Sequence, residues 1–183
     1  MDRTEFEQIV SSLYEGLFAF ALSLVHNRDE ACELTQETFS RLASKGHQLR
    51  DRSKIKSWLF TTLYRVFLAW RRRETRLPHL ELDSVSHELP AVAENTAESA
   101  DAGTILDRLW QIEERYRAPL VLFYLENHSY REIAEILDIP PGTVMSRLSR
   151  GKTLLREALA CSGPGPAANI LKINPASLPH CKP

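Results

Sequence analysis

The 183-residue sequence has little glycine and cysteine, and it lacks the short motifs that mark common catalytic sites. It holds only seven glycines and few runs of alternating apolar and polar residues, which favours helices over strands. No Gly-rich phosphate loop, GxSxG or HExxH motif occurs, and the six histidines show no spacing typical of metal ligands. We therefore expect no catalytic site, no metal and no cofactor, and a protein that is not an enzyme.

Cysteine usage and hydropathy both indicate a cytoplasmic protein. Cys32, Cys161 and Cys181 form no CxxC pair and no even set that could build a disulfide framework, so a reducing compartment is the simpler context. The polar residues 1–5 are unlike a signal peptide, and no apolar run approaches the length of a membrane span.

The net charge of −1 hides a strong segregation of charge along the chain. Residues 1–44 hold eight acids and three Lys/Arg, whereas residues 45–76 hold ten Lys/Arg and two acids. Residues 81–101 hold six acids and no Lys or Arg. This pattern predicts a basic surface for a polyanion and an acidic surface elsewhere.

Residues 129–156 contain two short helical patterns separated by a tight break at residues 138–142. Ile133, Ala134 and Leu137 form the apolar stripe of the first pattern. The two prolines at 140 and 141 cannot continue that helix, and Thr143 is placed to cap a second one. The second helix has an apolar side, with Val144, Leu148, Gly151 and Leu155, and a polar side, with Ser146, Ser149, Arg150 and Thr153.

A short helix, a sharp turn and a helix with an acid-free outer face are typical of a helix-turn-helix. The same pattern also fits an ordinary helical hairpin whose basic residues are solvated. Residues 143–156 carry four Lys/Arg and no Asp or Glu, whereas a helix that needs only solubility usually mixes both signs. This imbalance favours DNA binding.

Two longer helices are predicted in the N-terminal part of the chain. Apolar residues recur at three- and four-residue steps across residues 4–26, which predicts a core helix (Phe6, Ile9, Val10, Leu13, Leu17, Phe20, Ala21 and Leu24). A second helix is predicted over residues 29–44, with Ala31, Leu34, Thr35, Thr38 and Leu42 on its inner side. Its other side carries Glu30, Glu33, Gln36 and Glu37, a stripe that by itself fits a solvated surface.

Residues 47–56 have no apolar period and are predicted to form a loop, and residues 57–73 to form a third helix. Its apolar stripe is Leu59, Leu63, Val66 and Trp70, with Phe67 beside it, and the opposite side holds Thr61, Tyr64, Arg65, Leu68 and Arg72. Aromatic residues interleaved with arginine suit single-stranded nucleic acid. We assign Phe67 and Trp70 to the core, and Trp58 and Tyr64 are the better candidates for stacking on bases.

The remaining segments complete an all-α prediction of two small helical domains. Residues 77–102 are predicted to form an acidic linker, and residues 161–183, with five of the ten prolines, a flexible tail. Between them, two helices are expected to pack under the helix-turn-helix (Ile105, Leu109, Ile112, Leu120, Val121, Phe123, Tyr124 and Leu125). The predicted domains are therefore residues 1–76 and a four-helix domain at residues 103–160.

Taken together, these motifs resemble the extracytoplasmic-function (ECF, group 4) sigma factors of bacterial RNA polymerase. Residues 30–39, EACELTQETF, are similar to the family's DAEDLVQETF signature, and SWLF at 57–60 with RRR at 71–73 is similar to its TWLF…RRR segment. YREIA at 130–134 and PGTVMSRLSR at 141–150 are similar to its YEEIA…PxGTVxSRLxR signature. Arg65 and Ala69 stand where the family often has Asn and Asp, and Met145 where a basic residue is common.

The resemblance implies a function in transcription initiation. Core RNA polymerase would be bound by Glu33, Gln36 and Glu37. The melted minus-ten strand would be held by Lys54, Lys56, Trp58, Thr61, Tyr64, Arg65, Arg72 and Arg73. Duplex DNA of the minus-35 element would be bound by Thr143, Ser146, Arg147, Ser149, Arg150 and Lys152. An anti-sigma factor is a candidate further partner.

One alternative from another class remains open at this point. A one-component transcriptional regulator, with an N-terminal sensing or dimerisation domain, explains residues 129–156 equally well. It leaves unexplained both the Gln36-Glu37 signature and the segment at residues 58–73.

Overall fold

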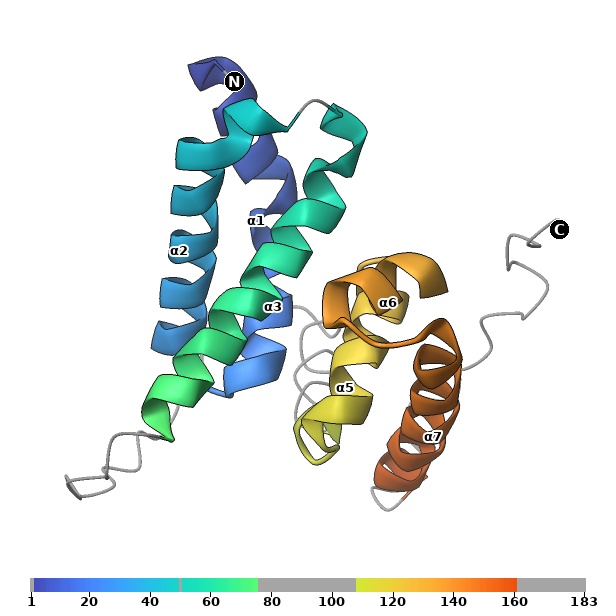
Figure 1. The fold of residues 1–183 in the computed structure, drawn as a ribbon. Helices are drawn as coiled ribbons and strands as arrows, with labels where there is room; N and C mark the ends of the chain where they lie inside the picture. Colours follow the sequence, from blue (N-terminus) through green and yellow to red (C-terminus); the bar gives the residue numbers. More distant parts are fainter. Residues whose placement is uncertain (1, 50, 76–107, 161–183) are drawn as a thin grey trace, which may run out of the picture.

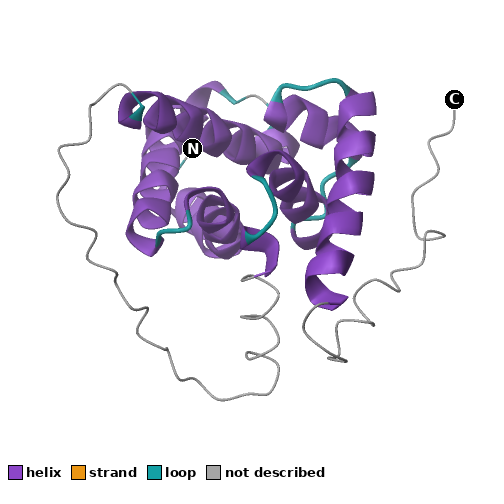
Figure 2. Cartoon of the chain, turned by 90° about the horizontal axis from the view of Figure 1, so that it is seen from below, coloured by secondary structure: helices purple, strands orange, loops and turns teal. Residues whose placement is uncertain are grey.

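The computed structural model describes residues 2–49, 51–75 and 108–160, and every regular element within these ranges is helical (Figures 1 and 2). This confirms the predicted all-α fold. The elements are α1 (Arg3–Val25), α2 (Arg28–Lys45), η1 (Gly46–Gln48), η2 (Arg52–Lys54), α3 (Ile55–Glu74), α5 (Glu114–Leu120), η3 (Val121–Leu125), α6 (Tyr130–Leu137) and α7 (Pro141–Ala160). The predicted linker at 77–102 and the predicted tail at 161–183 lie outside the described residues.

The first three helices pack into a bundle (Figure 1). Asp2 and Asn27 cap the first turns of α1 and α2 by accepting hydrogen bonds from backbone N–H groups, which fixes where each helix begins. Only the C-terminal half of the α1 stripe is buried: Leu17 and Phe20 are fully inaccessible, whereas the predicted core residues nearer the N-terminus are half-buried. The predicted inner side of α2 is confirmed, with Phe39 added to it.

The basic segment before α3 is more ordered than the loop predicted over residues 47–56. It contains the two short 3-10 turns η1 and η2, and α3 begins at Ile55 rather than at Ser57. Asp51 stabilises η2 because its carboxylate accepts hydrogen bonds from the backbone N–H and the hydroxyl of Ser53. Local side-chain hydrogen bonds of this kind leave no mark on apolar periodicity, which is why the pattern missed them.

The expectation that no segment reaches membrane-spanning length was wrong for α1. This helix has 23 residues and a mean hydropathy of 1.5 over its most apolar window, enough to span a membrane by length and composition alone. Its apolar residues instead pack against α2 and α3, as the burial of Phe20 and Leu24 shows. A soluble core helix can meet the same criterion.

The C-terminal helices form a second group around Ile133, Leu120 and Val144 (Figure 1). Leu109, Ile112, Leu120 and Val121 are buried as predicted, and Ile105 lies outside the described residues. Leu125 was wrongly assigned to the core, because its side chain is 51% exposed. Pro119, which has no N–H to donate, lies in α5, and the chain then continues as the π-helical segment η3, so the register expected for an α-helix is lost there.

The two groups of helices pack against each other, a feature that the prediction of two linked domains did not contain. Their buried residues form one continuous cluster, and α3 lies against α6 (Figure 1). Arg117 of α5, only 5% exposed, donates to the backbone carbonyl of Ser23 near the end of α1 at 2.5 Å. The groups therefore meet along a buried boundary.

Candidate functional site

Helix α7 presents a polar face to solvent and an apolar face to the core. Val144, Leu148 and Gly151 are buried, whereas Ser146, Ser149 and Arg150 are exposed, as predicted. Gly151 allows a close approach, because a Cβ added there would lie 3.0 Å from the Leu120 side chain. The tight packing against α5 fixes the rotation of α7 and so determines which side chains face outward.

Helix α6 and the turn after it hold α7 in place. Ser129 and Glu132 form a reciprocal capping box at the start of α6, and Asp138 ends the helix in the left-handed conformation. The predicted cap at Thr143 was wrong, since α7 already begins at Pro141 and the carbonyl of Pro140 accepts from the N–H of Thr143 at 2.9 Å. Proline is well suited to the first turn of a helix, where its missing N–H costs no hydrogen bond.

The predicted minus-35 residues divide between the open face and the edges of α7. Arg147 and Lys152 are half-buried, as is Thr143. The guanidinium of Arg150 lies 6.0 Å from the centre of the Tyr116 ring, which steadies its position while leaving it exposed. Met145 is a large apolar residue on the open face, 56% exposed.

A second surface is a groove of about 500 Å³ between α2 and α3. Glu33, Gln36 and Glu37 line it together, and all three are exposed, as the prediction of a polymerase-binding surface requires. Burial, followed by the charges of Glu74 and Glu33, raises the pKa of Glu30 on the same wall. Arg41 also lines the groove and pairs with Glu37 at 2.8 Å, so the three acids outnumber one base and the α2 side keeps a net negative charge.

The α3 side of the groove includes Trp70 and Arg73. Trp70, assigned to the core, is half-buried: it packs against the hydrophobic core and also lines the groove. Arg73, assigned to the melted strand, lines the same groove. The structure thus places Arg73 with Glu33 and Glu37 rather than with Lys56.

The remaining predicted minus-ten residues lie on two faces of α3 and just before it. Lys54, Arg65 and Arg72 are exposed. Trp58 and Thr61 are half-buried, and the Thr61 hydroxyl donates to the carbonyl of Ser57 within the helix. Lys56 and Tyr64 lie where α3 meets the C-terminal helices. Burial there raises the pKa of the Tyr64 hydroxyl.

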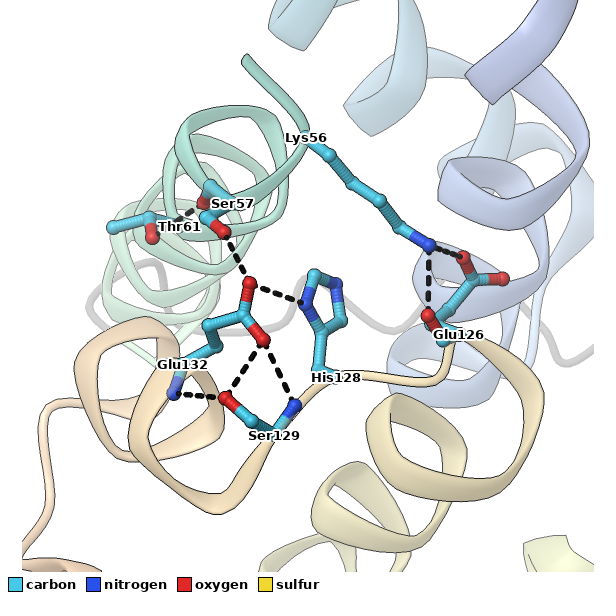
Figure 3. Close-up of polar contacts among 7 residues, drawn as sticks. All are labelled: Lys56, Ser57, Thr61, Glu126, His128, Ser129 and Glu132. Atoms are coloured by element: carbon cyan, nitrogen blue, oxygen red, sulfur yellow. Dashed lines mark hydrogen bonds and ion pairs between the residues drawn. The ribbon is translucent and has the colours of Figure 1, made fainter. Parts of the chain in front are cut away.

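The boundary between α3 and the C-terminal helices carries a polar cluster that the sequence did not reveal (Figure 3). Lys56 Nζ donates to the backbone carbonyl of Glu126 at 2.7 Å and lies 3.3 Å from its carboxylate. The hydroxyl of Ser57 donates to Glu132 Oε1 at 3.0 Å. The partners are 70 and 75 positions apart, so no local pattern could have signalled them.

His128 lies at the centre of this cluster (Figure 3). Its side chain is buried, its Nδ1 lies 3.8 Å from Glu132 Oε1, and its ring meets the edge of Phe60 at 4.8 Å between centroids. Burial lowers the pKa of His128 to about 4, and the positive charge of Lys56 acts in the same direction. The imidazole is therefore neutral at physiological pH.

Comparison with known proteins identifies the family. The sequence model described as Sigma-70 region 2 matches residues 9–77, and the one described as Sigma-70, region 4 matches residues 103–155. The chain is 32% identical over 150 residues to the ECF RNA polymerase sigma factor EcfG of Rhodopseudomonas palustris, covering 81% of each protein. The chain belongs to the ECF sigma factors of bacterial RNA polymerase.

Further relatives agree with this assignment. The ECF RNA polymerase sigma factor SigM of Bacillus subtilis is 25% identical over 151 residues, covering 82% of this chain and 92% of that protein. Among solved structures, the fold is similar to that of the sigma factor RpoE from Bartonella quintana, which was solved in complex with the anti-sigma factor NepR. That match has a TM-score of 0.68 and 26% identity, and it covers 85% of this chain and 97% of the other.

As an ECF sigma factor, the protein binds core RNA polymerase and directs transcription initiation at specific promoters. The alternative of a one-component regulator is not favoured, because the N-terminal helices match a sigma region rather than a sensing domain. The family is one of DNA-binding regulators.

Proposed function

We propose that this sigma factor uses three separate surfaces to bind core polymerase, the melted minus-ten strand and the minus-35 duplex. The groove between α2 and α3 binds core polymerase, α3 and the turn before it bind the melted minus-ten strand, and the open face of α7 reads the minus-35 duplex. The protein acts in the cytoplasm without catalysing a reaction of its own.

The observation that supports this division best is the separation of buried and exposed sides of α7. Over residues 143–156 its exposed side chains are small hydroxyls, arginine and Met145, with no acid to repel phosphate. Arg150 can make the bidentate contact that distinguishes guanine from other bases, while Ser146 lies about 40° away on the same side. The half-buried Arg147 is better placed for a phosphate, which orients the protein without carrying sequence information.

The α2 and α3 groove is suited to a protein partner rather than to DNA. Its α2 wall presents Glu33 and Glu37, which would repel a phosphate backbone but attract a basic helix. Trp70 offers an apolar anchor at the groove wall, the kind of residue that often dominates binding energy in an interface. We assign Arg73 to this polymerase-binding groove.

An anti-sigma factor is proposed as a regulatory partner. The support is the structure of RpoE, a relative of similar fold that was solved with such a partner.

Promoter-specific transcription with purified core polymerase tests the assignment of α7. The double variant Ser146→Ala with Arg150→Ala should lower initiation about tenfold or more at a promoter that depends on its minus-35 element. The control is Arg131→Ala, because Arg131 is an exposed arginine on α6 that pairs with Glu135, and its loss changes the charge equally. Equal effects of the two variants would contradict a reading role for α7.

A further inference from the structure

One large apolar side chain lies exposed near the start of α7. Met145 is 56% exposed, although the other large aliphatic residues of this helix are buried or packed against the core. Among the described residues, only Tyr14 and Leu125 are large apolar residues with comparable exposure, and they belong to α1 and η3. Single exposed apolar residues are common on protein surfaces, so exposure alone indicates no function. The position of Met145 on α7 is what distinguishes it.

Met145 lies beside the side chains proposed to face the minus-35 duplex. Successive residues of a helix are about 100° apart, so Ser149 lies about 40° from Met145, one turn further along. Arg150 lies about 140° from Met145, at the opposite edge of the open face. The N-terminal residues of a recognition helix are the ones that contact base edges. Met145 is therefore within reach of the bases when α7 lies in the major groove.

The residues around Met145 leave its side chain unobstructed. A helical side chain leans over the preceding turn, where Pro141 and Gly142 lie here, both exposed. A Cβ added at Gly142 would have no described atom from outside its own turn within 4 Å. The hydroxyl of Ser146 donates to the carbonyl of Thr143 at 3.0 Å, so this short side chain folds back onto the helix. Among the exposed residues at 141–147, Met145 thus has the longest side chain.

The chemistry of the methionine side chain selects one feature of the major groove. Donors and acceptors line the base edges there, and the one apolar group is the C5-methyl of thymine. The thioether donates no hydrogen bond and accepts only weakly, so a polar base edge held against Met145 would lose water without gaining a good partner. A thymine methyl group gains from the same burial. The unbranched methionine chain can also adjust to the position of that methyl group.

We propose that Met145 is a specificity-determining residue that selects thymine at one base pair of the minus-35 element by packing against its C5-methyl group. The proposal rests on the assignment of α7 to the minus-35 duplex, and it names a base that this surface selects. Met145 and Arg150 are separated by about 140° around the helix and about 7.5 Å along it, so they contact different base pairs. The element therefore contains a thymine besides the base pair that Arg150 contacts.

The test uses deoxyuridine, which lacks only the C5-methyl group of thymidine and pairs with adenine in the same way. At each position and on each strand of the minus-35 element, one promoter duplex carries thymine and its matched duplex carries uracil. Competition binding to the reconstituted polymerase holoenzyme, followed by fluorescence anisotropy, gives the ratio of the two affinities. The wild-type holoenzyme should prefer thymine about three- to fourfold at one position, which is the factor expected for burial of one methyl group.

Variants of Met145 show whether this residue causes the preference. Met145→Gln keeps the length of the side chain but makes its end polar, and it should lower the ratio at that position to about one. Met145→Leu should retain most of the preference. The matched control is Leu125→Gln, because Leu125 is also an exposed apolar residue, at 51%, but belongs to η3. Its ratio should equal that of the wild type.

Three results would overturn the proposal. The first is a wild-type holoenzyme without a thymine preference at any position. The second is an unchanged preference in Met145→Gln, and the third is a loss of preference in Leu125→Gln equal to that in Met145→Gln. Circular dichroism checks that each variant is folded, which we expect because both positions are exposed.

Failure of the α7 assignment gives a different result. If the variant Ser146→Ala with Arg150→Ala initiates transcription as well as Arg131→Ala does, α7 does not read the minus-35 duplex, and the proposal for Met145 falls with that assignment. If the double variant impairs initiation while Met145→Gln keeps the full thymine preference, α7 reads the element and only the role of Met145 is wrong.

Discussion

Acidification from pH 7 to pH 5 is expected to destabilise the folded protein by up to about 2 kcal/mol through His128 alone. The side chain is 3% exposed, and its Nε2 has no hydrogen-bond partner among the described residues. Burial is the largest cause that lowers the pKa of His128 from 6.5 to about 4, Lys56 adds to it, and Glu132 opposes it. Protonation of His128 in the folded state is therefore unfavourable mainly because it buries a positive charge.

Stability falls with pH because the unfolded chain binds a proton at His128 at a higher pH than the folded chain does. Above pH 6.5 neither the folded nor the unfolded chain protonates His128, and the full stability is present. As the pH falls below 6.5, the unfolded chain takes up a proton and the folded chain does not, so stability is lost until the pH nears 4. At pH 5 an unfolded histidine is almost wholly charged and the folded one about a tenth charged, which corresponds to about 2 kcal/mol.

Urea denaturation followed by circular dichroism, repeated between pH 7 and pH 5, measures this effect. His128→Phe is the control, because phenylalanine keeps a ring against Phe60 and does not titrate. The pKa of His26 is also lowered by burial, and both proteins retain that contribution. The free energies of unfolding of the two proteins should diverge as the pH falls, and parallel curves would refute the role of His128.

Three further predictions concern the binding surfaces. Glu33→Lys with Glu37→Lys should abolish binding to core polymerase with an unchanged circular dichroism spectrum, since both side chains are exposed; normal affinity would exclude the α2 groove. Arg150→Ala should relax the base preference at one minus-35 base pair, whereas Arg147→Ala should weaken binding to all sequences evenly. A binding scan of single-base promoter variants at two salt concentrations measures both effects. The reverse pattern would mean that α7 is rotated differently. Arg72→Ala should reduce permanganate reactivity of the melted strand in the holoenzyme while leaving the fold intact, and normal strand opening would remove Arg72 from the minus-ten surface.

The differences between the sequence predictions and the structure have one cause. The spacing of apolar residues predicts which side of a helix is apolar, but not where the helix ends or which elements pack against it. Trp70 continues the apolar stripe of α3 and packs against the core, yet it also lines a groove. Leu125 follows an apolar run, but the π-helical turn at Val121–Leu125 rotates it into solvent. Thr143 has the chemistry of a cap, but the helix had already begun two residues earlier.

The sequence alone determined the positions of the helices, the break after α6 and the acid-free face of α7, because these features depend on local interactions. Each depends on residues within a few positions of one another, such as the stripe from Ile133 to Leu137 and the prolines that follow it. The tertiary structure alone decided that Lys56 meets Glu126, that Arg117 meets Ser23, and that Arg73 joins the α2 groove. These contacts depend on the angles at which separate helices pack, and those angles are set by the shapes of whole buried surfaces rather than by any short run of residues.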